Sequence, residues 1–337
     1  MNITLLGAGA WGTALALSLS PRHQVLLWSR DAQAIAAMRA TRENSRYLPG
    51  IALPDALQLS ADLDAAVAHA RGGLLIVASS VSGLRPILTA IVENTASGAH
   101  AVESLVWLCK GFEEGTASLP HQVVQQVMGD ALPVGVLSGP SFAQEVARGL
   151  PCALSIGSPS SELRAKVVAA VHGSSMRVYS TDDLTGVEVG GAVKNILAIA
   201  TGIADGLGLG MNARAALITR GLAEITRLGI ALGGRSETFM GLTGVGDLIL
   251  TCTGDLSRNR QVGLGLAAGK SLQAIVSELG HVAEGVRCVQ AVRTIAAREK
   301  IDMPIVDAVA RVLFESGSPL QAIEQLLARE ARAENLR

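Results

Sequence analysis

The sequence is poor in aromatic residues and has no excess of charge of either sign. Aromatic residues make up 3% of the chain and apolar residues 49%, while the formal net charge is −1. A nearly neutral chain produces no overall field that would recruit nucleic acid or an anionic membrane surface. The high apolar content argues against disorder and favours closely packed helices and strands. We therefore expect a globular protein with no nucleic-acid partner.

Cysteine and histidine are too scattered to suggest a metal or redox site. Cys109, Cys152, Cys252 and Cys288 lie far apart, and none of the six histidines has a second histidine at ligand spacing. Widely separated cysteines predict reduced thiols, as in the cytosol, rather than a disulfide framework. We expect no metal centre and a cytoplasmic location.

Long hydrophobic runs and targeting signals are also missing. Met1 leads directly into a short apolar run, without the basic start and cleavage site of a signal peptide. No uncharged apolar stretch of about 18 residues, the length that suggests a transmembrane helix, runs without glycine breaks. We expect no membrane span.

The order of apolar patterns predicts an α/β protein. The chain of 337 residues is long enough for two domains with their own cores. In the first half, short apolar runs alternate with helical patterns, which indicates a parallel sheet covered on both faces. The strands are predicted at residues 2–6, 24–28, 74–78, 104–109 and 133–137, with 152–156 and 177–179 as possible additions.

Beyond residue 182 the pattern is helical and strand signals almost disappear. Helices are predicted at 187–204, 213–231, 257–267, 271–278, 285–298, 304–315 and 319–330. We predict a Rossmann-type doubly wound sheet domain over residues 1–182. An all-helical substrate and catalytic domain is expected over residues 183–337.

A glycine motif follows the first predicted strand and opens the first helix. Gly7 permits a tight turn, Gly9 lets the backbone approach a pyrophosphate, and Gly12 allows the helix to pack closely on the strand. The helix N-terminus adds amides and a partial positive charge. In this strand–turn–helix context the motif predicts dinucleotide binding rather than a purely structural turn.

The end of the second predicted strand bears on which dinucleotide is bound. An NAD-selective site usually places an acidic residue there, whereas an arginine accommodates the 2′-phosphate of NADP. The order here is Ser29-Arg30-Asp31. Arg30 therefore favours acceptance of NADP, and Asp31 is equally suited to bind ribose or to cap the next helix.

Two more loops follow predicted strands at the edge where ligands of parallel sheets bind. Lys110 follows the fourth strand, and the segment 138–143, with two serines and exposed amides, follows the fifth. These loops suit a small polar ligand. An ordinary loop lysine and a plain tight turn are the alternatives.

One lysine stands inside a long apolar helix pattern. Lys194 is the only charged residue between Val189 and Ala204. A buried ammonium must find partners or lose its proton, so such a lysine suits proton transfer near neutral pH. The alternative is a lysine whose stem packs in the core while its head reaches water.

The helical half contains two further polar groups with possible roles. Asp247 stands alone among glycines and apolar residues, where it could accept a substrate hydroxyl, pair with a lysine or cap a helix. Ser257, Arg258 and Asn259 lie at a predicted helix start, a combination suited to phosphate. The alternative for this triplet is a solvated basic turn.

Taken together, these motifs closely resemble the bacterial NAD(P)-dependent glycerol-3-phosphate dehydrogenases over nearly the whole chain. The matching segments are GAGAWGTALA at 7–16, YLPG at 47–50, KG at 110–111, SGPSFAQEVARGLP at 138–151, GVEVGGAVKNILAIA at 186–200, NARAALITRGLAE at 212–224, GLTGVGDLILTCT at 241–253, SRNR at 257–260 and VAEG at 282–285. Two departures are Ala10, where members often have serine, and Ala78 before Ser79, where many have proline.

The resemblance implies reduction of dihydroxyacetone phosphate to sn-glycerol 3-phosphate with NADPH or NADH, a homodimer, and a role in phospholipid synthesis. It implies that Lys194 is the proton acceptor in the oxidation direction. The implied substrate contacts are Lys110, Gly139, Ser141, Lys194, Asp247, Ser257, Arg258 and Asn259. Besides the three glycines, the implied cofactor contacts are Trp11, Arg30, Tyr47, Lys110, Ala143, Arg258, Val282 and Glu284.

Two other functions fit part of the pattern. A related lysine-using dehydrogenase acting on a 3-hydroxy acid would need a carboxylate clamp instead of the phosphate-binding triplet. A nucleotide-binding sensor without catalysis would have no need of a buried amine.

Overall fold

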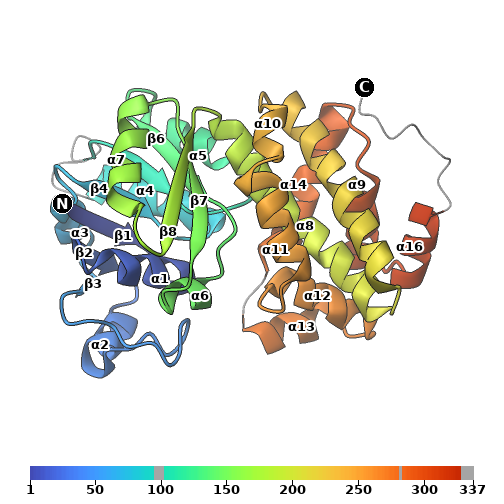
Figure 1. The fold of residues 1–337 in the computed structure, drawn as a ribbon, viewed down its shortest axis with the longest axis horizontal. Helices are drawn as coiled ribbons and strands as arrows, with labels where there is room; N and C mark the ends of the chain where they lie inside the picture. Colours follow the sequence, from blue (N-terminus) through green and yellow to red (C-terminus); the bar gives the residue numbers. More distant parts are fainter. Residues whose placement is uncertain (95–101, 281–282, 328–337) are drawn as a thin grey trace. The chain divides into compact units, whose positions relative to one another are not determined.

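The computed structural model describes residues 1–94, 102–280 and 283–327 (Figure 1). The chain divides into two compact units. The first comprises Met1–Lys110 and Leu119–Leu184, and the second comprises Gly111–Ser118 and the chain from Thr185 onward. The segment Gly111–Ser118 thus leaves the first unit and groups with the second.

The first unit is a Rossmann-like domain built on one eight-stranded sheet, as predicted. The strand order is β3-β2-β1-β4-β5-β6-β7-β8. The strands are β1 (Asn2–Leu6), β2 (Gln24–Trp28), β3 (Gln58–Ser60), β4 (Leu74–Val77), β5 (Leu105–Trp107), β6 (Val134–Ser138), β7 (Cys152–Gly157) and β8 (Met176–Thr181). The strand order reverses between the neighbouring strands β1 and β4, and the ligand crevice of such sheets lies at this switch point.

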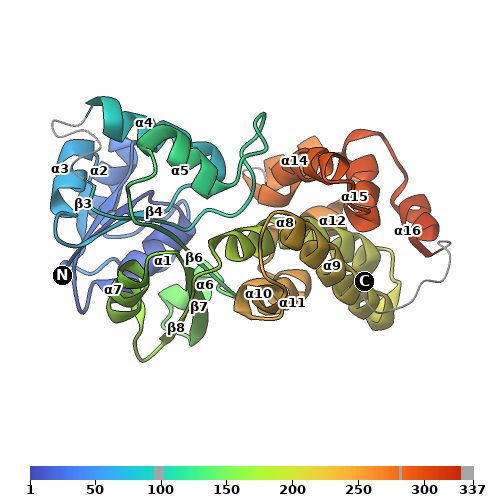
Figure 2. The ribbon, with the colours of Figure 1, turned by 90° about the horizontal axis from the view of Figure 1, so that it is seen from above.

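Helices cover both faces of this sheet, because its central strands are apolar on both sides. Every residue of β4 and β5 is buried. The helices are α1 (Ala10–Leu19), α2 (Ala32–Thr41), α3 (Leu63–His69), α4 (Val81–Asn94), α5 (Pro120–Met128), α6 (Ala143–Ala147) and α7 (Ser161–Val171). Figure 2 shows α4 and α5 on one face and α1 and α7 on the other.

The prediction of a wholly parallel sheet is wrong at one place, because β7 runs antiparallel to β6. The connection between them packs the short helix α6 against α1 instead of carrying the chain back along the sheet. β7 therefore begins beside the end of β6, and Ser155 pairs with Ser138. Strand β3 was not predicted, since its three residues are too few to show a period.

The second unit is helical, as predicted. Its elements are α8 (Leu184–Gly206), α9 (Gly210–Ala231), α10 (Ser236–Phe239), the π-helical turn η2 (Leu242–Gly246), α11 (Asp247–Thr253), α12 (Arg258–Ala267), α13 (Leu272–Leu279), α14 (Glu284–Arg298), α15 (Pro304–Phe314) and α16 (Pro319–Leu327). The stretch from α10 to α11 was not predicted as helix, because its glycines interrupt the apolar period.

Helix α8 is the central helix of the second unit. It is apolar on all sides and is buried from Gly186 to Ala204, and Figures 1 and 2 show the other helices around it. By length and composition alone it could cross a membrane, but its apolar window is 100% buried inside the protein. A helix that is hydrophobic all round is typical of a protein core, and this core position buries Lys194.

Candidate active site

The glycine turn between β1 and α1 has the shape that a bound dinucleotide requires. Gly7 has a φ of +132°, and a Cβ there would lie 2.6 Å from the Ala78 carbonyl oxygen. At Gly12 a Cβ would lie 2.1 Å from the Gly7 oxygen, so this glycine allows helix and turn to touch. Around the position of a Cβ on Gly9, by contrast, no described atom outside Gly9 and its two chain neighbours lies within 4 Å. Backbone atoms therefore crowd the turn at Gly7 and Gly12, whereas the space beside Gly9 is open.

The open side of this turn is the N-terminus of α1. Gly9 is the N-cap residue, and no side chain of the described residues caps the helix there. The first amides of a helix have no partners within the helix, and together with the macrodipole they attract an anion. Open space in front of Gly9 and uncapped amides beside it fit the pyrophosphate of a nicotinamide dinucleotide.

Asp31, which follows the end of β2, has one of the two roles predicted for it, that of a helix cap. Its carboxylate accepts a hydrogen bond of 3.0 Å from the Ala34 amide and so caps α2. Arg30 is exposed immediately before it. Farther along the first unit, Tyr47 is also exposed, and the Arg46 guanidinium lies 5.1 Å from the centre of its ring.

The loops after β5 and β6 meet at one carbonyl group. The Nζ atom of Lys110 lies 3.2 Å from the oxygen of Gly139, and the Ser141 hydroxyl donates to the same oxygen at 3.1 Å. The structure thus brings together three predicted substrate residues at the carboxyl ends of neighbouring strands. Trp11 on α1 and Ala143 on α6 are partly buried against the core of this unit.

In the second unit, Lys194 projects from α8 into the protein interior. Its ammonium donates to the carboxylate of Asp247, the first residue of α11, and to the hydroxyl of Thr251 at 2.8 Å. Lys194 is 6% exposed and Asp247 1%. The alternative of a lysine head that reaches water is therefore wrong, because this ammonium is held by buried partners.

Thr251 was missed by the sequence analysis. Its hydroxyl also donates to the backbone oxygen of Asp247 at 2.6 Å, one helical turn earlier. Residues four apart share one helix face, so the spacing from Asp247 to Thr251 was the available signal. The π-helical turn η2 comes directly before Asp247 and sets where α11 begins.

The predicted phosphate-binding triplet begins α12, and its members have different surroundings. Ser257 caps the helix by accepting from the Arg260 amide at 3.3 Å. Asn259 is buried, donates to the Asn195 side-chain oxygen at 2.9 Å, and accepts from the Gly285 amide at 2.9 Å. Two of the three side chains therefore also hold the helix in place.

Arg258 is the charged member of the triplet, and it is exposed. Partial desolvation lowers the pKa of its guanidinium, and the Glu284 carboxylate raises it. Desolvation raises the pKa of Glu284, which Arg287 and Arg258 lower. An arginine remains charged under such a perturbation, so a cation stands beside the N-terminus of α12. Val282 lies outside the described residues.

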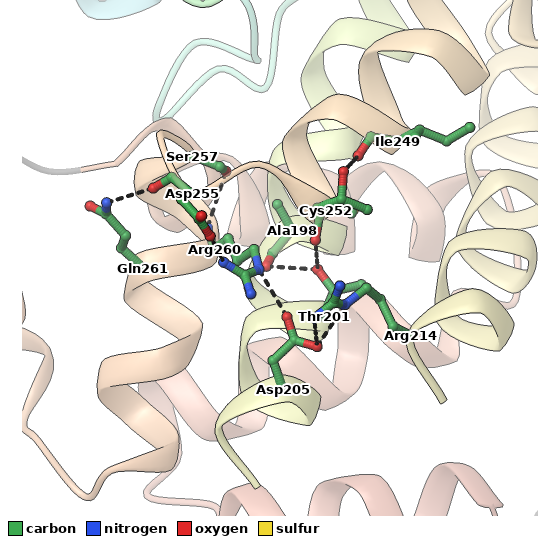
Figure 3. A network of polar contacts seen from close by, with 11 residues as sticks. Ala198, Thr201, Asp205, Arg214, Ile249, Cys252, Asp255, Ser257, Arg260 and Gln261 are labelled. Carbon is green, nitrogen blue, oxygen red and sulfur yellow. Dashed lines mark hydrogen bonds and ion pairs between the residues drawn. The ribbon is translucent and has the colours of Figure 1, made fainter. Parts of the chain in front are cut away.

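An ion-pair network anchors α12 from behind, as Figure 3 shows. Arg260 donates to Asp205 at 2.8 Å and to Asp255 at 3.0 Å, while Arg214 donates to Asp205 at 2.7 Å. The network joins the end of α8, the start of α9 and the start of α12. The guanidinium of Arg260 is therefore held by two carboxylates and has a structural role. Arg258 is the arginine of this turn that is exposed to solvent.

The predicted site residues thus form two groups, one on each unit. The group on the first unit comprises Gly7, Gly9, Trp11, Gly12, Arg30, Tyr47, Lys110, Gly139, Ser141 and Ala143. The group on the second unit comprises Lys194, Asp247, Ser257, Arg258, Asn259 and Glu284. Among the residues that the structure describes, no three or more histidine, cysteine, aspartate or glutamate side chains could together hold a metal ion.

Comparisons with known proteins cover both units. The family profile described as "NAD-dependent glycerol-3-phosphate dehydrogenase N-terminus" matches residues 2–164, and its C-terminal counterpart matches residues 183–324. Proteins named glycerol-3-phosphate dehydrogenase [NAD(P)+] from Janthinobacterium sp. (strain Marseille) and Herminiimonas arsenicoxydans are 67% and 66% identical to the chain, over 99% of each sequence. The crystal structure of glycerol-3-phosphate dehydrogenase from Coxiella burnetii is similar at 42% identity and a TM-score of 0.90, and the match covers 97% of this chain and 98% of that one.

Proposed function

The chain belongs to the family of NAD-dependent glycerol-3-phosphate dehydrogenases, and from this premise we propose that it interconverts dihydroxyacetone phosphate and sn-glycerol 3-phosphate. The observation that carries the proposal is the buried ammonium of Lys194, paired with Asp247 in the core of the second unit. Such an amine has a use in a reaction that moves a proton. A protein that only bound nucleotide would have none.

NADPH or NADH is the cofactor of this proposal, and the nicotinamide ring, when bound, supplies the hydride. The turn from Gly7 to Gly12 would hold the pyrophosphate by its amides. Arg30, exposed at the end of β2, would hold the 2′-phosphate of NADPH by a bidentate contact. Asp31 caps α2, so it has one oxygen fewer for ribose, and this favours acceptance of NADPH.

Lys194 is proposed as the general acid in the reductive direction and the general base in the oxidative direction. Its ammonium would polarise the C2 carbonyl of dihydroxyacetone phosphate and give a proton to that oxygen. Asp247 balances the charge of the ammonium, and Thr251 fixes its direction by a second hydrogen bond. Lys110 and Ser141 would bind the polar groups of the same substrate.

The start of α12 is proposed as the phosphate site. Arg258 supplies a positive charge, and the helix N-terminus supplies amides and its dipole. Ser257 and Asn259 keep the helix end in place through the bonds described above. Glu284 carries a carboxylate beside Arg258, and with Val282 it is proposed to contact the cofactor.

The test is an absorbance assay of NADPH and NADH oxidation. The substrates compared are dihydroxyacetone phosphate, unphosphorylated dihydroxyacetone and a 3-oxo acid, which is the oxidised form of a 3-hydroxy acid. We expect turnover with dihydroxyacetone phosphate and at least about a hundredfold lower kcat/KM without the phosphate, since charge-assisted contacts of this kind contribute about 1.5–3 kcal/mol each. An enzyme indifferent to the phosphate would contradict the proposal and favour a 3-hydroxy acid substrate.

We further propose that the protein is a cytoplasmic homodimer that supplies glycerol 3-phosphate for phospholipid synthesis. Light scattering coupled to size-exclusion chromatography would test the dimer. A mass equal to that of the single chain, 34.7 kDa, would contradict it.

A further inference from the structure

Asn44 forms a link within the first unit that the glycine motif alone does not reveal. It lies in the loop after α2 and is 4% exposed. Its side-chain Nδ2 donates to the backbone oxygen of Ala8 at 2.9 Å and to the hydroxyl of Thr13 at 2.8 Å. One amide group therefore joins the turn before α1 to the first turn of α1 itself.

The contact with Ala8 determines the direction of a neighbouring N–H group. A peptide group is planar and, when trans, points its carbonyl and its N–H in opposite directions. The described residues contain no cis peptide bond. Holding the Ala8 oxygen toward Asn44 therefore directs the Gly9 N–H away from Asn44. Among the described contacts, no acceptor within the protein takes this N–H.

Such an anchor is needed because one of the two residues that bound this peptide group is a glycine. The orientation of the Ala8–Gly9 peptide group depends on ψ of Ala8 and on φ of Gly9, and glycine permits backbone conformations that other residues exclude. Without an external contact, this peptide group would be free to rotate away from a bound anion. The bond from Asn44 to the Thr13 hydroxyl also fixes the start of α1 relative to Asn44. Thr13 is fully buried, and its backbone amide donates to the Gly9 oxygen at 2.9 Å.

The loop that carries Asn44 is itself held firmly. The backbone oxygen of Asn44 accepts from the backbone amides of Tyr47 and Leu48 at 3.2 and 2.8 Å, and Leu48 is buried in the core of the first unit. Glu43 pairs with Ala52 across the loop. Because this loop has its own hydrogen bonds and core contacts, the Asn44 side chain has a fixed position and can restrict the conformation of the glycine turn.

We propose that Asn44 is a positioning residue that orients the Ala8–Gly9 peptide group toward the pyrophosphate of the dinucleotide. Asparagine suits this place because one nitrogen carries two N–H donors, which a hydroxyl or a carboxylate lacks. Asn44 acts through the turn, and its proposed target rests on the proposed use of NADPH.

The experiment measures NADPH binding to the free protein by fluorescence titration, without any turnover. In Asn44→Asp the carboxylate has the same shape but has no proton to donate to the Ala8 carbonyl oxygen, although the Thr13 hydroxyl can still donate to it. We therefore expect the Kd of NADPH to rise at least about tenfold. Thr13→Val removes only the second bond and should raise the Kd less. In Asn44→Asp the affinity for ADP-ribose, a competitor that contains the pyrophosphate, should fall by the same factor as the affinity for NADPH. The affinity for adenosine 2′-phosphate, which lacks the pyrophosphate, should be the same as in the wild type.

Loss of stability is separated from loss of positioning by a matched control. Ser158 is a buried residue of the first unit whose hydroxyl donates to the Val134 oxygen. Ser158→Ala should lower the unfolding midpoint without changing the Kd of NADPH. An Asn44→Asp protein that is folded by circular dichroism and binds NADPH within twofold of the wild type would overturn the inference alone. A wild-type protein that binds neither NADPH nor NADH would overturn the proposed function as well.

Discussion

The ammonium of Lys194 and the carboxylate of Asp247 form a buried ion pair that joins the central helix α8 to the first residue of α11. The two residues are 53 positions apart in the chain. Each charge makes the burial of the other tolerable, because an isolated buried ion is strongly destabilising. The same pair therefore concerns both the stability of the second unit and the proposed proton transfer.

Replacing Lys194 tests the proton transfer. We expect Lys194→Ala to lower kcat by roughly 10²–10⁴, the usual contribution of a general acid or base. The Kd of NADPH should stay close to the wild-type value, since the glycine turn is untouched. Stopped-flow turnover and fluorescence titration measure the two quantities. Lys270→Ala, at an exposed lysine of the same unit, is the control, and near-normal turnover in Lys194→Ala would show the assignment to be wrong.

Replacing Asp247 tests the pair as a structural element. Asp247→Asn leaves the ammonium without its counter-charge, so we expect the free energy of unfolding to fall by about 3–5 kcal/mol. A double variant, Lys194→Met with Asp247→Leu, should recover most of that loss while remaining inactive. Urea unfolding followed by circular dichroism provides the comparison. The account fails if the double variant is as unstable as the single one.

The glycine turn predicts opposite outcomes for two similar substitutions. Gly9 has a φ of −74° and open space around it, so Gly9→Ala should fold normally but raise the Kd of NADPH about tenfold or more. Gly12→Ala should instead destabilise the fold by about 1–3 kcal/mol, because its Cβ would overlap the Gly7 oxygen. Thermal unfolding and NADPH titration on both variants distinguish these effects. Equal behaviour of the two would contradict the assigned roles.

The titration of Glu224 should make the stability of the second unit depend on pH. Its buried carboxylate accepts from the amides of Ile305 and Val306 at the start of α15, and burial raises its pKa from 4.5 to about 7. The folded state therefore binds a proton that the unfolded state releases between these values. This contribution, roughly 3 kcal/mol, is present below the unfolded pKa and is lost as the pH rises through the folded pKa.

The measurement is urea unfolding at steps from about pH 5 to about pH 8. In the wild type this group makes stability fall over the window, and in Glu224→Gln that part of the slope should vanish. Glu237→Gln, at an exposed glutamate, is the matched control. An unchanged slope in Glu224→Gln would show that the raised pKa is not what drives the pH dependence.

Replacing Arg258 should lower kcat/KM only for a substrate that carries a phosphate. Arg258→Ala should lower kcat/KM for dihydroxyacetone phosphate roughly 10- to 100-fold, because a charge-assisted contact is removed. The low rate with unphosphorylated dihydroxyacetone should change little. Arg298→Ala, at an exposed arginine paired with Glu299, serves as the control. Equal losses with both substrates would contradict a contact to phosphate.

Features that depend on neighbouring residues were predictable from the chain. The glycine turn and the apolar strands β1, β2 and β4 arise from local backbone geometry and local hydrophobic pattern. Their positions in the structure agree with the predicted ranges within a residue. The antiparallel direction of β7, whose residues had been given as a possible strand, depends on where α6 packs and was not predicted. The helix α11 was not predicted, because the glycines before it interrupt the apolar pattern.

The partners of the buried polar groups were decided by tertiary structure alone. Asn44 lies 36 residues from Ala8, and Lys194 lies 57 residues from Thr251. No period in the sequence connects such positions, since they meet only when whole helices and loops pack. The sequence by itself determined that a dinucleotide turn and a lone core lysine exist. Only the packed fold decided which groups hold them, because each buried donor must find its acceptor wherever the chain brings one.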